Sequence, residues 1–486
     1  MNMAPLTYTP MRLIWLVMAI LALQAYPQGR NFREVTVTGH KPLKEIGLQR
    51  SVLDSMALKE NIAMSIADVL AYNSSIFVKN AGRATLSTVA FRGTSASHTQ
   101  VTWNGLKINS PMLGMTDFST IPSYFIDNAS LLHGASSVNE TGGGLGGAIR
   151  LESAPDVPSG FNMQYIQGIG SFRTFDEFAG ISYKNDHWTT STRAVYSSSV
   201  NDYTYTNHDK KLNIYDENNN ITGQYHPREH NRNGAYHDMH LLQDITYNTL
   251  RGDRISLNVW YLDSHRELPL LTTDYTDDTR YENLQREHTV RAIMNWTHTR
   301  SRWKTNVNAG YIHTGMAYNY SRATTADRPM TPMTQSHSRV NTFHGYADGE
   351  YMPNRQWLFT ASLSADQNLV LSHDKNISGQ DGSDRLVGYD VGQLDASGAL
   401  SAKWRPVNRF GMSVTLRKEV HGHEWAPLIP ALFLESIISE SAGLEAKASI
   451  TRNYRAPSLN DLYFMPGGNP ELNSESRGLT HILTTG

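Results

Sequence analysis

Three groups of residues have types and spacings that could bind a ligand or cofactor. Gly142, Gly144 and Gly147 satisfy G-x-G-x-x-G, which holds a dinucleotide pyrophosphate when a helix follows. Asp274, Asp277 and Asp278 offer the hard carboxylate oxygens that Ca²⁺ prefers. A third group carries imidazoles, which suit haem and transition metals. Its members are His226, His230, His237 and His240, with Glu229 and Asp238 nearby.

Each group also has a simpler structural interpretation. A short alternating segment follows Gly147, so the glycines fit a tightly turning loop better than a nucleotide site. His237 and His240 are three residues apart and would face opposite ways in a strand, which favours a solvated loop. The aspartates fit an exposed acidic loop equally well. A calcium site is therefore an open expectation, and no other cofactor is predicted.

The sequence predicts no enzymatic activity. It contains no H-E-x-x-H, no G-x-S-x-G and no Walker A motif. It also contains no cysteine, which excludes disulfides, thiolate metal sites, a cysteine nucleophile and a lipid-modified cysteine anchor. An exported β-rich enzyme would need a catalytic constellation that these residues do not offer.

The composition favours an alternating β protein. Charged residues make up 18% and aromatic residues 10% of the 486 residues, and mean hydropathy is −0.44. Such a chain is too polar for a bundle of membrane helices. The net charge is −2, so the chain as a whole does not attract a negatively charged polymer. No nucleic acid partner is therefore expected.

The N-terminus resembles an export signal. Arg12 precedes an uncharged apolar run over residues 13–23, which suits a signal-peptide core and is short for a membrane span. We predict a signal peptide over residues 1–25, with an uncleaved anchor helix as the alternative. The mature chain is expected to leave the cytoplasm.

Residues 41–155 are predicted to form a small α+β domain. Ser65 can cap a helical turn, because Asp68 follows three residues later and the apolar residues between 66 and 70 share one helical face. This spacing predicts a capped helical turn over residues 65–70. Asn104-Gly105 stands between two alternating segments and predicts a tight β-hairpin.

Residues 156–486 alternate polar and apolar side chains with the period of a β-strand. Residues 254–261, 303–311 and 410–417 each place their apolar side chains on one face, with aromatics at the ends. Tight turns near residues 185–186, 250–253, 300–301, 353–354 and 406–408 alternate with long polar segments. We assign those long segments to residues 200–238, 263–287, 314–339 and 367–388.

Short turns at one end and long loops at the other are typical of an outer-membrane barrel. In hydrocarbon every backbone polar group must be paired, and a closed sheet satisfies that requirement. The alternating segments are long enough for about fourteen tilted membrane strands.

Together these features resemble a TonB-dependent outer-membrane receptor, with the cobalamin and siderophore receptors as the closest-looking subgroup. The resemblance rests on several segments in the family's order: residues 65–70, 91–93, 101–108, 125–137, 143–149, 455–463 and 468–472. It implies a mostly β fold, a transmembrane antiparallel β-barrel with an N-terminal α+β plug domain. The plug is assigned to residues 41–155 and the barrel to residues 156–486.

The resemblance also implies partners. Residues 26–40 occupy the position of the TonB-box region, which a TonB-type energy-coupling protein would bind by strand addition. The box itself is assigned to Glu34, Val35, Thr36, Val37 and Thr38. The other expected partners are outer-membrane lipid and a small nutrient ligand, namely cobalamin, haem or a ferric siderophore. The expected location is the outer membrane of a Gram-negative bacterium.

Ligand contacts are expected on two plug loops that hairpin geometry directs outward, residues 95–98 and 109–115. The candidates are Ser95, Ser97, His98, Asn109 and Met112. Ordinary loop or plug–barrel packing is the alternative role for these residues. At the level of the whole protein, the alternative function is a passive porin-like or adhesin-type barrel without energy coupling, which would need no plug.

The family resemblance raises one further expectation. Barrels of this class close with about 22 strands. Here the sequence ends at Gly486 after about fourteen strands, and an unclosed sheet would leave bare edges in the bilayer. We therefore expect the chain to be a fragment of a longer receptor.

Overall fold

The computed structural model describes residues 43–139, 144–270, 280–323, 325, 327–375, 387–439 and 441–485. These residues belong to one unit, Pro42–Gly486. The predicted signal peptide, the TonB-box residues and the three candidate calcium ligands Asp274, Asp277 and Asp278 lie outside the described residues. No helix within the described ranges is both long and apolar enough to cross a membrane.

The N-terminal part is a mixed five-stranded sheet with short helices, here called the plug. Its strands run in the order β1-β6-β7-β4-β5, and only β4 and β7 pair in parallel among them. The bounds are β1 Arg50–Val52, α2 Ser55–Leu58, α3 Ile66–Asn73, β2 Phe77–Asn80, β3 Ser87–Ala90, β4 Thr99–Trp103, β5 Leu106–Lys107, β6 Asn128–His133 and β7 Gly147–Glu152.

Two local predictions in the plug are confirmed. Ser65 caps α3 and forms a reciprocal capping box with Asp68, so two of the helix's free N–H groups are satisfied. Asn104 and Gly105 link β4 to β5 with φ angles of 51° and 92°, a geometry that Asn-Gly accepts readily.

The glycine-rich loop leads into a strand, as predicted, because Gly147 is the first residue of β7. A Cβ on Gly147 would lie 2.6 Å from the carbonyl oxygen of Leu132, so glycine is needed for close backbone approach. A dinucleotide site needs a helix at this point. The G-x-G-x-x-G spacing therefore marks a packing position here.

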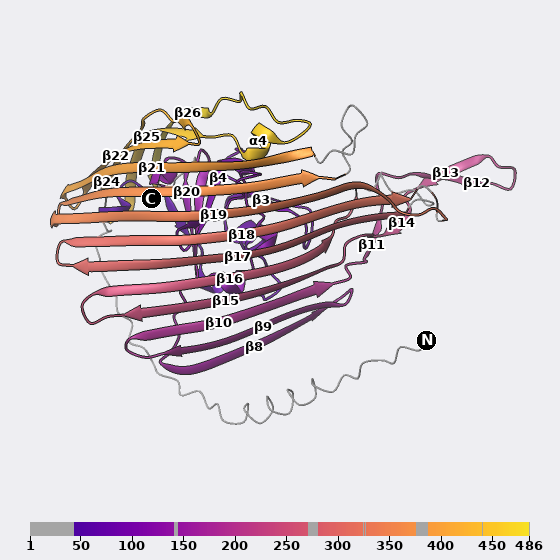
Figure 1. Cartoon of the computed structure of the whole chain (residues 1–486), viewed down its shortest axis with the longest axis horizontal. Coiled ribbons are helices and arrows are strands. Elements are labelled where there is room, and N and C mark those ends of the chain that lie inside the picture. The colour runs from indigo at the N-terminus through magenta and orange to yellow at the C-terminus, as the bar shows by residue number, and fades with distance from the viewer. Residues whose placement is uncertain are drawn as a thin grey trace. The chain divides into compact units, whose positions relative to one another are not determined.

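The rest of the described chain forms one antiparallel sheet, here called the wall. Fourteen strands follow one another as neighbours from β8 to β26, and they run side by side in Figure 1. The bounds are β8 Gly160–Gly170, β9 Thr174–Lys184, β10 Trp188–Ser199, β15 Tyr236–Asn248, β16 Asp253–Glu267, β17 Arg280–Arg300, β18 Trp303–Ala323, β19 Thr331–Asn354, β20 Trp357–Asp374, β21 Val387–Val407, β22 Phe410–His421, β24 Ile429–Ser439, β25 Leu444–Arg455 and β26 Glu475–Thr485.

Short strands and a helix lie in the connections between the wall strands. Between β10 and β15, β12 and β13 form a hairpin and the flanking β11 and β14 pair with each other, while β23 pairs with the end of β22. These elements are β11 Thr204–Thr206, β12 Leu212–Tyr215, β13 Ile221–Tyr225, β14 Arg228–His230, β23 Glu424–Trp425 and α4 Leu459–Tyr463. Within the described residues, β8 and β26 each pair with a single neighbour.

The wall alternates its side chains as the sequence predicts. In β16, Asn258 and Trp260 are buried against the plug side, whereas Leu257 is 40% exposed on the opposite face. In β22, Ser413 and Thr415 are buried on the inner face. The outward face is therefore apolar and the inward face largely polar, the arrangement of a barrel in lipid.

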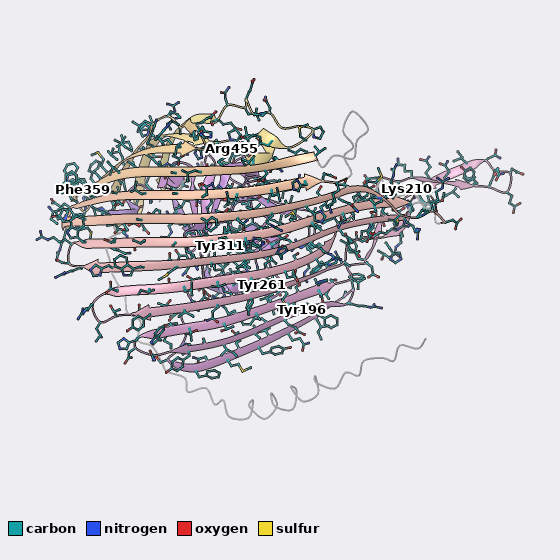
Figure 2. All side chains as sticks on the ribbon, viewed as in Figure 1. Tyr196, Lys210, Tyr261, Tyr311, Phe359 and Arg455 are labelled. Atoms are coloured by element: carbon teal, nitrogen blue, oxygen red, sulfur yellow. The ribbon has the colours of Figure 1, made fainter. Side chains whose placement is uncertain are left out.

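Aromatic side chains line one end of the outward face. Trp188 packs at a tilt against Tyr247 and Trp303 stacks on Tyr351, with ring centroids 4.6 and 4.4 Å apart. Phe359 lies at this end of β20 in Figure 2. All belong to the end with the tight turns, where an interfacial girdle would lie.

The long connections are shorter than the sequence predicted. β18 continues to Ala323 and β19 starts at Thr331, so most of the predicted 314–339 loop is strand. Likewise β16 reaches Glu267 and β17 starts at Arg280. These strand ends carry polar side chains on both faces, so the two-residue period that marks a half-buried strand is missing there.

The core lies where the plug meets the wall. Trp103 of the plug and Trp260 of the wall are both 0% exposed and meet edge to face with centroids 5.4 Å apart. Phe125 of the plug packs on the same Trp260 ring at 5.8 Å. Burial of these rings excludes water from the interface and holds the plug against the wall.

Candidate functional site

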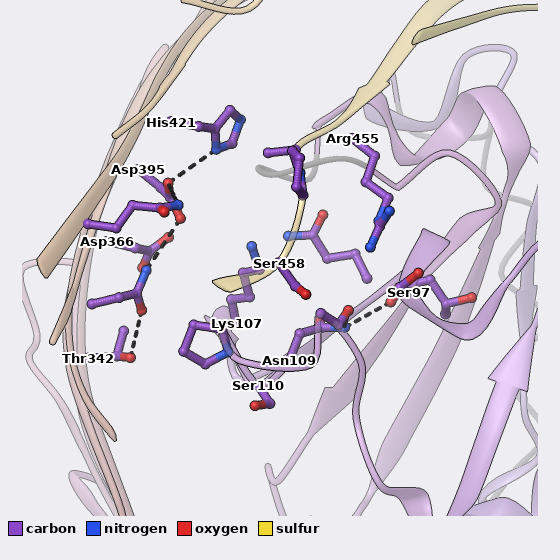
Figure 3. Close-up of a pocket in the computed structure, with 18 residues that line it drawn as sticks. Ser97, Lys107, Asn109, Ser110, Thr342, Asp366, Asp395, His421, Arg455 and Ser458 are labelled. Carbon is purple, nitrogen blue, oxygen red and sulfur yellow. Dashed lines mark hydrogen bonds and ion pairs between the residues drawn. The ribbon is translucent and has the colours of Figure 1, made fainter. Parts of the chain in front are cut away.

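A polar pocket lies between the plug loops and the inner face of the wall. Plug residues Ser97, Lys107 and Asn109 line one side, and wall residues such as Asp395 and His421 line the other (Figure 3). The cavity volume is about 80 Å³, which suits a few water molecules. It is too small to enclose a bulky nutrient.

A chain of hydrogen bonds crosses four wall strands along this pocket. Thr342 of β19 donates to Asn368 of β20 at 2.8 Å, and Asn368 donates to Asp395 of β21 at 3.3 Å. His421 of β22 pairs with the same carboxylate at 3.2 Å. Figure 3 shows these contacts as one line along the wall, so the polar groups are fixed by their neighbours.

The chain continues toward the plug. The second ring nitrogen of His421 lies 3.2 Å from Glu419, and Glu419 pairs with Arg417 at 2.8 Å. Arg417 in turn donates to the carbonyl oxygen of Val138 in the plug. These side chains are nearly inaccessible to water, so the plug backbone and the pocket wall belong to one buried network.

The segment after β25 closes the pocket on a third side. Ser458 caps α4 and forms a capping box with Asp461, and Arg455 lies 3.2 Å from the same carboxylate. Burial alone would raise the pKa of Asp461, but the hydrogen bonds from Ser458 and the Arg455 charge outweigh it and lower the pKa. Asp461 is therefore held as an anion that orients both neighbours.

The five sequence-predicted contact residues occupy different positions. Ser97 and Asn109 line the pocket, but the Asn109 amide is engaged by backbone groups of the plug, including Val101 and Thr99. His98 pairs with Glu475 of β26 at 2.9 Å. Met112 packs on a hydrophobic cluster of the wall.

Ser95 is exposed and its hydroxyl bonds to that of Ser97 at 2.8 Å. Ser97 thus lines the pocket, and this contact holds Ser95 beside it, outside the lining. Asn109 and Met112 hold the plug loop, and His98 joins it to the wall.

The candidate histidine group does not converge. In β15, His237 is exposed and His240 is buried on the opposite face, as the strand period predicts. His226 and His230 contact the backbone oxygens of Lys210 and Asp202. Within the ranges that the structure describes, no group of three or more potential ligands has the geometry of a metal site.

Buried arginines of the wall anchor the plug. Arg193 of β10 pairs with Asp127 of the plug at 3.0 Å and with Asp244 of β15 at 2.7 Å. Lys59 lies 3.2 Å from the same Asp127, and burial lowers the pKa of Lys59 against the opposing attraction of Asp127. Removing one partner would leave a buried charge uncompensated.

A second anchor lies two strands away. Arg266 of β16 pairs with Asp238 of β15 at 2.6 Å and with Asp117 of the plug at 3.5 Å. It also donates to the hydroxyl of Ser119 at 2.7 Å. The plug is therefore attached to the wall by ion pairs as well as by aromatic packing.

Sequence reasoning did not identify the wall side of the pocket. Asn368 lies within a segment that the sequence assigned to a loop, and Asp395 and His421 come from two further strands. The available signal was the alternation of polar residues along β19, where Thr342, His344 and Tyr346 share the inner face. Only strand pairing brings these separate segments together.

A plug that packs inside an antiparallel wall with an apolar outward face defines the class of plugged membrane β-barrels. Two family models match the chain: "TonB-dependent Receptor Plug Domain" over residues 42–148 and "TonB dependent receptor-like, beta-barrel" over residues 160–477. The chain belongs to the TonB-dependent receptor family. Members of this family are outer-membrane transport receptors rather than enzymes.

Curated relatives match parts of the chain. It is 31% identical over 114 residues to the vitamin B12 transporter BtuB of Photobacterium profundum, covering 24% of this chain and 19% of that protein. It is 31% identical over 74 residues to BtuB of Vibrio vulnificus, covering 15% and 12%. The chain thus spans less than a fifth of the curated relatives it matches.

Solved structures resemble it over most of its length. The siderophore receptor PirA from Acinetobacter baumannii gives a TM-score of 0.66 at 13% identity, covering 92% of this chain and 69% of that one. The copper transporter OprC gives 0.65 at 12% identity, covering 89% and 70%. The FrpB iron transporter from Neisseria meningitidis gives a TM-score of 0.66 at 14% identity, covering 89% of this chain and 69% of that one. At these identities the similarity concerns the fold.

Proposed function

We propose that this chain acts in TonB-dependent, energy-coupled uptake of a scarce, bulky nutrient across the outer membrane of a Gram-negative bacterium. Residues 34–38 would bind the TonB-type protein by strand addition, the mode by which an extended segment pairs with a sheet edge. The work of moving the plug would come from that partner. The receptor itself then needs no catalytic group.

The observation that supports this proposal is the attachment of the plug. Trp103 is fully buried against Trp260, and Asp127 is held by Arg193 in a nearly inaccessible ion pair. Breaking such contacts costs several kcal/mol by their usual magnitudes, about 3–5 for an unpaired buried charge alone. An equilibrium cost of this size keeps the plug closed in most molecules, which supports opening driven by the energy-coupling partner.

Cobalamin is the first candidate nutrient, with haem or a ferric siderophore next. The two curated relatives are vitamin B12 transporters, although each match is partial. A volume of about 80 Å³ is too small for any of the three ligands to enter the polar pocket itself. We place a bulky ligand on the loop side of that pocket, against Ser97 and the exposed Ser95 beside it.

Uptake and binding of radiolabelled cobalamin test the proposal. The full chain is expressed in a Gram-negative host without its own cobalamin receptor, with and without the TonB protein. A variant lacking residues 34–38 is compared in parallel. We expect unchanged binding to the cells, and loss of uptake both in the variant and in the host without TonB.

The outcomes separate the alternatives. Uptake that persists without residues 34–38 contradicts energy coupling and favours a passive barrel. If the cells bind haem or a ferric siderophore but not cobalamin in the same assay, that ligand becomes the proposed nutrient. The proposal of energy coupling is unaffected by this result.

A further inference from the structure

A separate hollow lies on the outward face of the wall, away from the plug. It spans β17 to β20, which run side by side in Figure 1, and its volume is about 620 Å³. We name it the outer cationic groove. Its defining residues are Arg286, His288, His313, His337, Arg339 and His373.

Strand alternation fixes the direction of these side chains. Thr289, Ile312 and Val340 are buried on the inner face, at 0%, 9% and 5% exposure. Each is the chain neighbour of a groove residue, namely His288, His313 and Arg339, so those three point outward.

The shape of the groove depends on a glycine. A Cβ on Gly315 would overlap the imidazole ring of His288, so the ring lies over the bare backbone of β18. On the other side, His313 donates to the Asn341 carboxamide oxygen at 2.8 Å, and Tyr311 donates to the same atom at 2.9 Å. The groove is therefore a built depression with fixed walls.

The groove lies at one border of the apolar outward band. Tyr311, labelled on β18 in Figure 2, is followed two residues later by His313, and Leu371 of β20 is followed by His373. Both steps lead toward the end with the long connections. In barrels of this kind that end faces the outside, so the groove lies at the depth of the outer-leaflet headgroups.

The charge of the groove is one-sided. Two arginines and four histidines line it, and none of the described lining residues is acidic. Asp263 is opposite His288 in the strand register but does not line the groove. Within the described part of the chain, neither Arg286 nor Arg339 forms a hydrogen bond or ion pair with its side chain.

We infer that the outer cationic groove binds the phosphorylated headgroup of an outer-leaflet glycolipid. Arginine forks match phosphate oxygens in a bidentate manner, and imidazoles add hydrogen-bond donors. The acyl chains of the same lipid would lie along the apolar band below Tyr311 and Leu371. Such a lipid supplies the partners that the two arginines lack within the described part of the protein.

Native mass spectrometry of the full chain in detergent tests this inference. The probe is lipid A carrying two phosphates, compared with the same lipid after removal of both phosphates and with inorganic phosphate alone. We expect the phosphorylated lipid to stay bound, and the R286Q/R339Q variant to bind it about tenfold or more weakly. The matched control is R251Q/R302Q, which removes two exposed arginines from the tight-turn end.

Three results would overturn the inference. These are equal retention of phosphorylated and dephosphorylated lipid, equal binding by R286Q/R339Q and wild type, or full displacement of the lipid by inorganic phosphate. The H313Q/H337Q variant provides a second test if the arginine variant does not fold, with a loss of about threefold expected. Cobalamin uptake is a separate readout, so failure here is distinguishable from failure of the proposed function.

Discussion

Trp103 in the plug and Trp260 in the wall meet edge to face with both side chains fully buried, and Arg291 lies over the Trp260 ring at 4.6 Å. These contacts join two parts of the chain that are far apart in sequence. The indole pair is the centre of the plug–wall core.

Replacing Trp260 with alanine is expected to loosen the plug. Loss of a fully buried tryptophan costs about 3–5 kcal/mol, and the cavity borders plug residues Trp103 and Phe125. Hydrogen exchange of strand β4 should become faster. The matched control is W303A, because Trp303 is 56% exposed on the outward face. Similar exchange of β4 in both variants would contradict the assigned role.

Arg193→Gln is expected to destabilise the plug–wall contact more than a surface change does. Asp127 and Asp244 would both lose their guanidinium partner in a nearly inaccessible site, at a cost of about 3–5 kcal/mol. The midpoint of urea unfolding measures the effect. Arg251→Gln, at an exposed turn, should leave the midpoint unchanged. An unchanged midpoint for the Arg193 variant would count against the anchor.

Ser458→Ala is expected to free the start of α4 beside the pocket. The Ser458 hydroxyl accepts from the backbone N–H of Asp461, and loss of such a cap costs about 1 kcal/mol. Amide exchange over Leu459–Tyr463 should accelerate about fivefold. The same substitution at Ser362 in β20 serves as the control, and equal acceleration there would show a nonspecific effect.

Acidification is expected to weaken the plug through His133. Burial lowers its pKa, as does the nearby Arg92 charge, and its ring contacts the Ser51 hydroxyl at 2.9 Å. A His with a depressed folded pKa stabilises the fold above its unfolded value of about 6.5 and loses that contribution as pH falls through the folded pKa. The protection factors of the β6 amides, which correct for the pH dependence of intrinsic exchange, should therefore fall below about pH 6. The H133Q variant should flatten this dependence, and an unchanged slope would assign the effect to another group.

The features that sequence alone predicted are those decided by local chemistry. Ser65 and Asp68 are three residues apart, and Asn104-Gly105 has one favoured turn, so the helix and the hairpin follow directly. The outward face of β16 also follows from its two-residue period.

The polar pocket and the buried anchors could not be predicted in the same way. Thr342, Asn368 and Asp395 meet only because three strands pair in one register. Arg193 contacts Asp127, which lies 66 positions away in the chain. Such contacts depend on the packing of plug against wall, which no local pattern encodes.

A disulfide between plug and wall tests directly whether the plug must move away from the wall during uptake. The chain has no cysteine, and a Cβ at Gly411 of β22 would lie 3.0 Å from Cγ2 of Ile46 in the plug, which favours cross-linking in an I46C/G411C variant. Nutrient uptake is measured before and after addition of a reductant, with nutrient binding as the control. We expect the oxidised variant to bind nutrient without transporting it, and reduction to restore uptake. If the cross-linked protein transports nutrient as fast as the protein treated with reductant, the plug does not need to leave the wall during uptake.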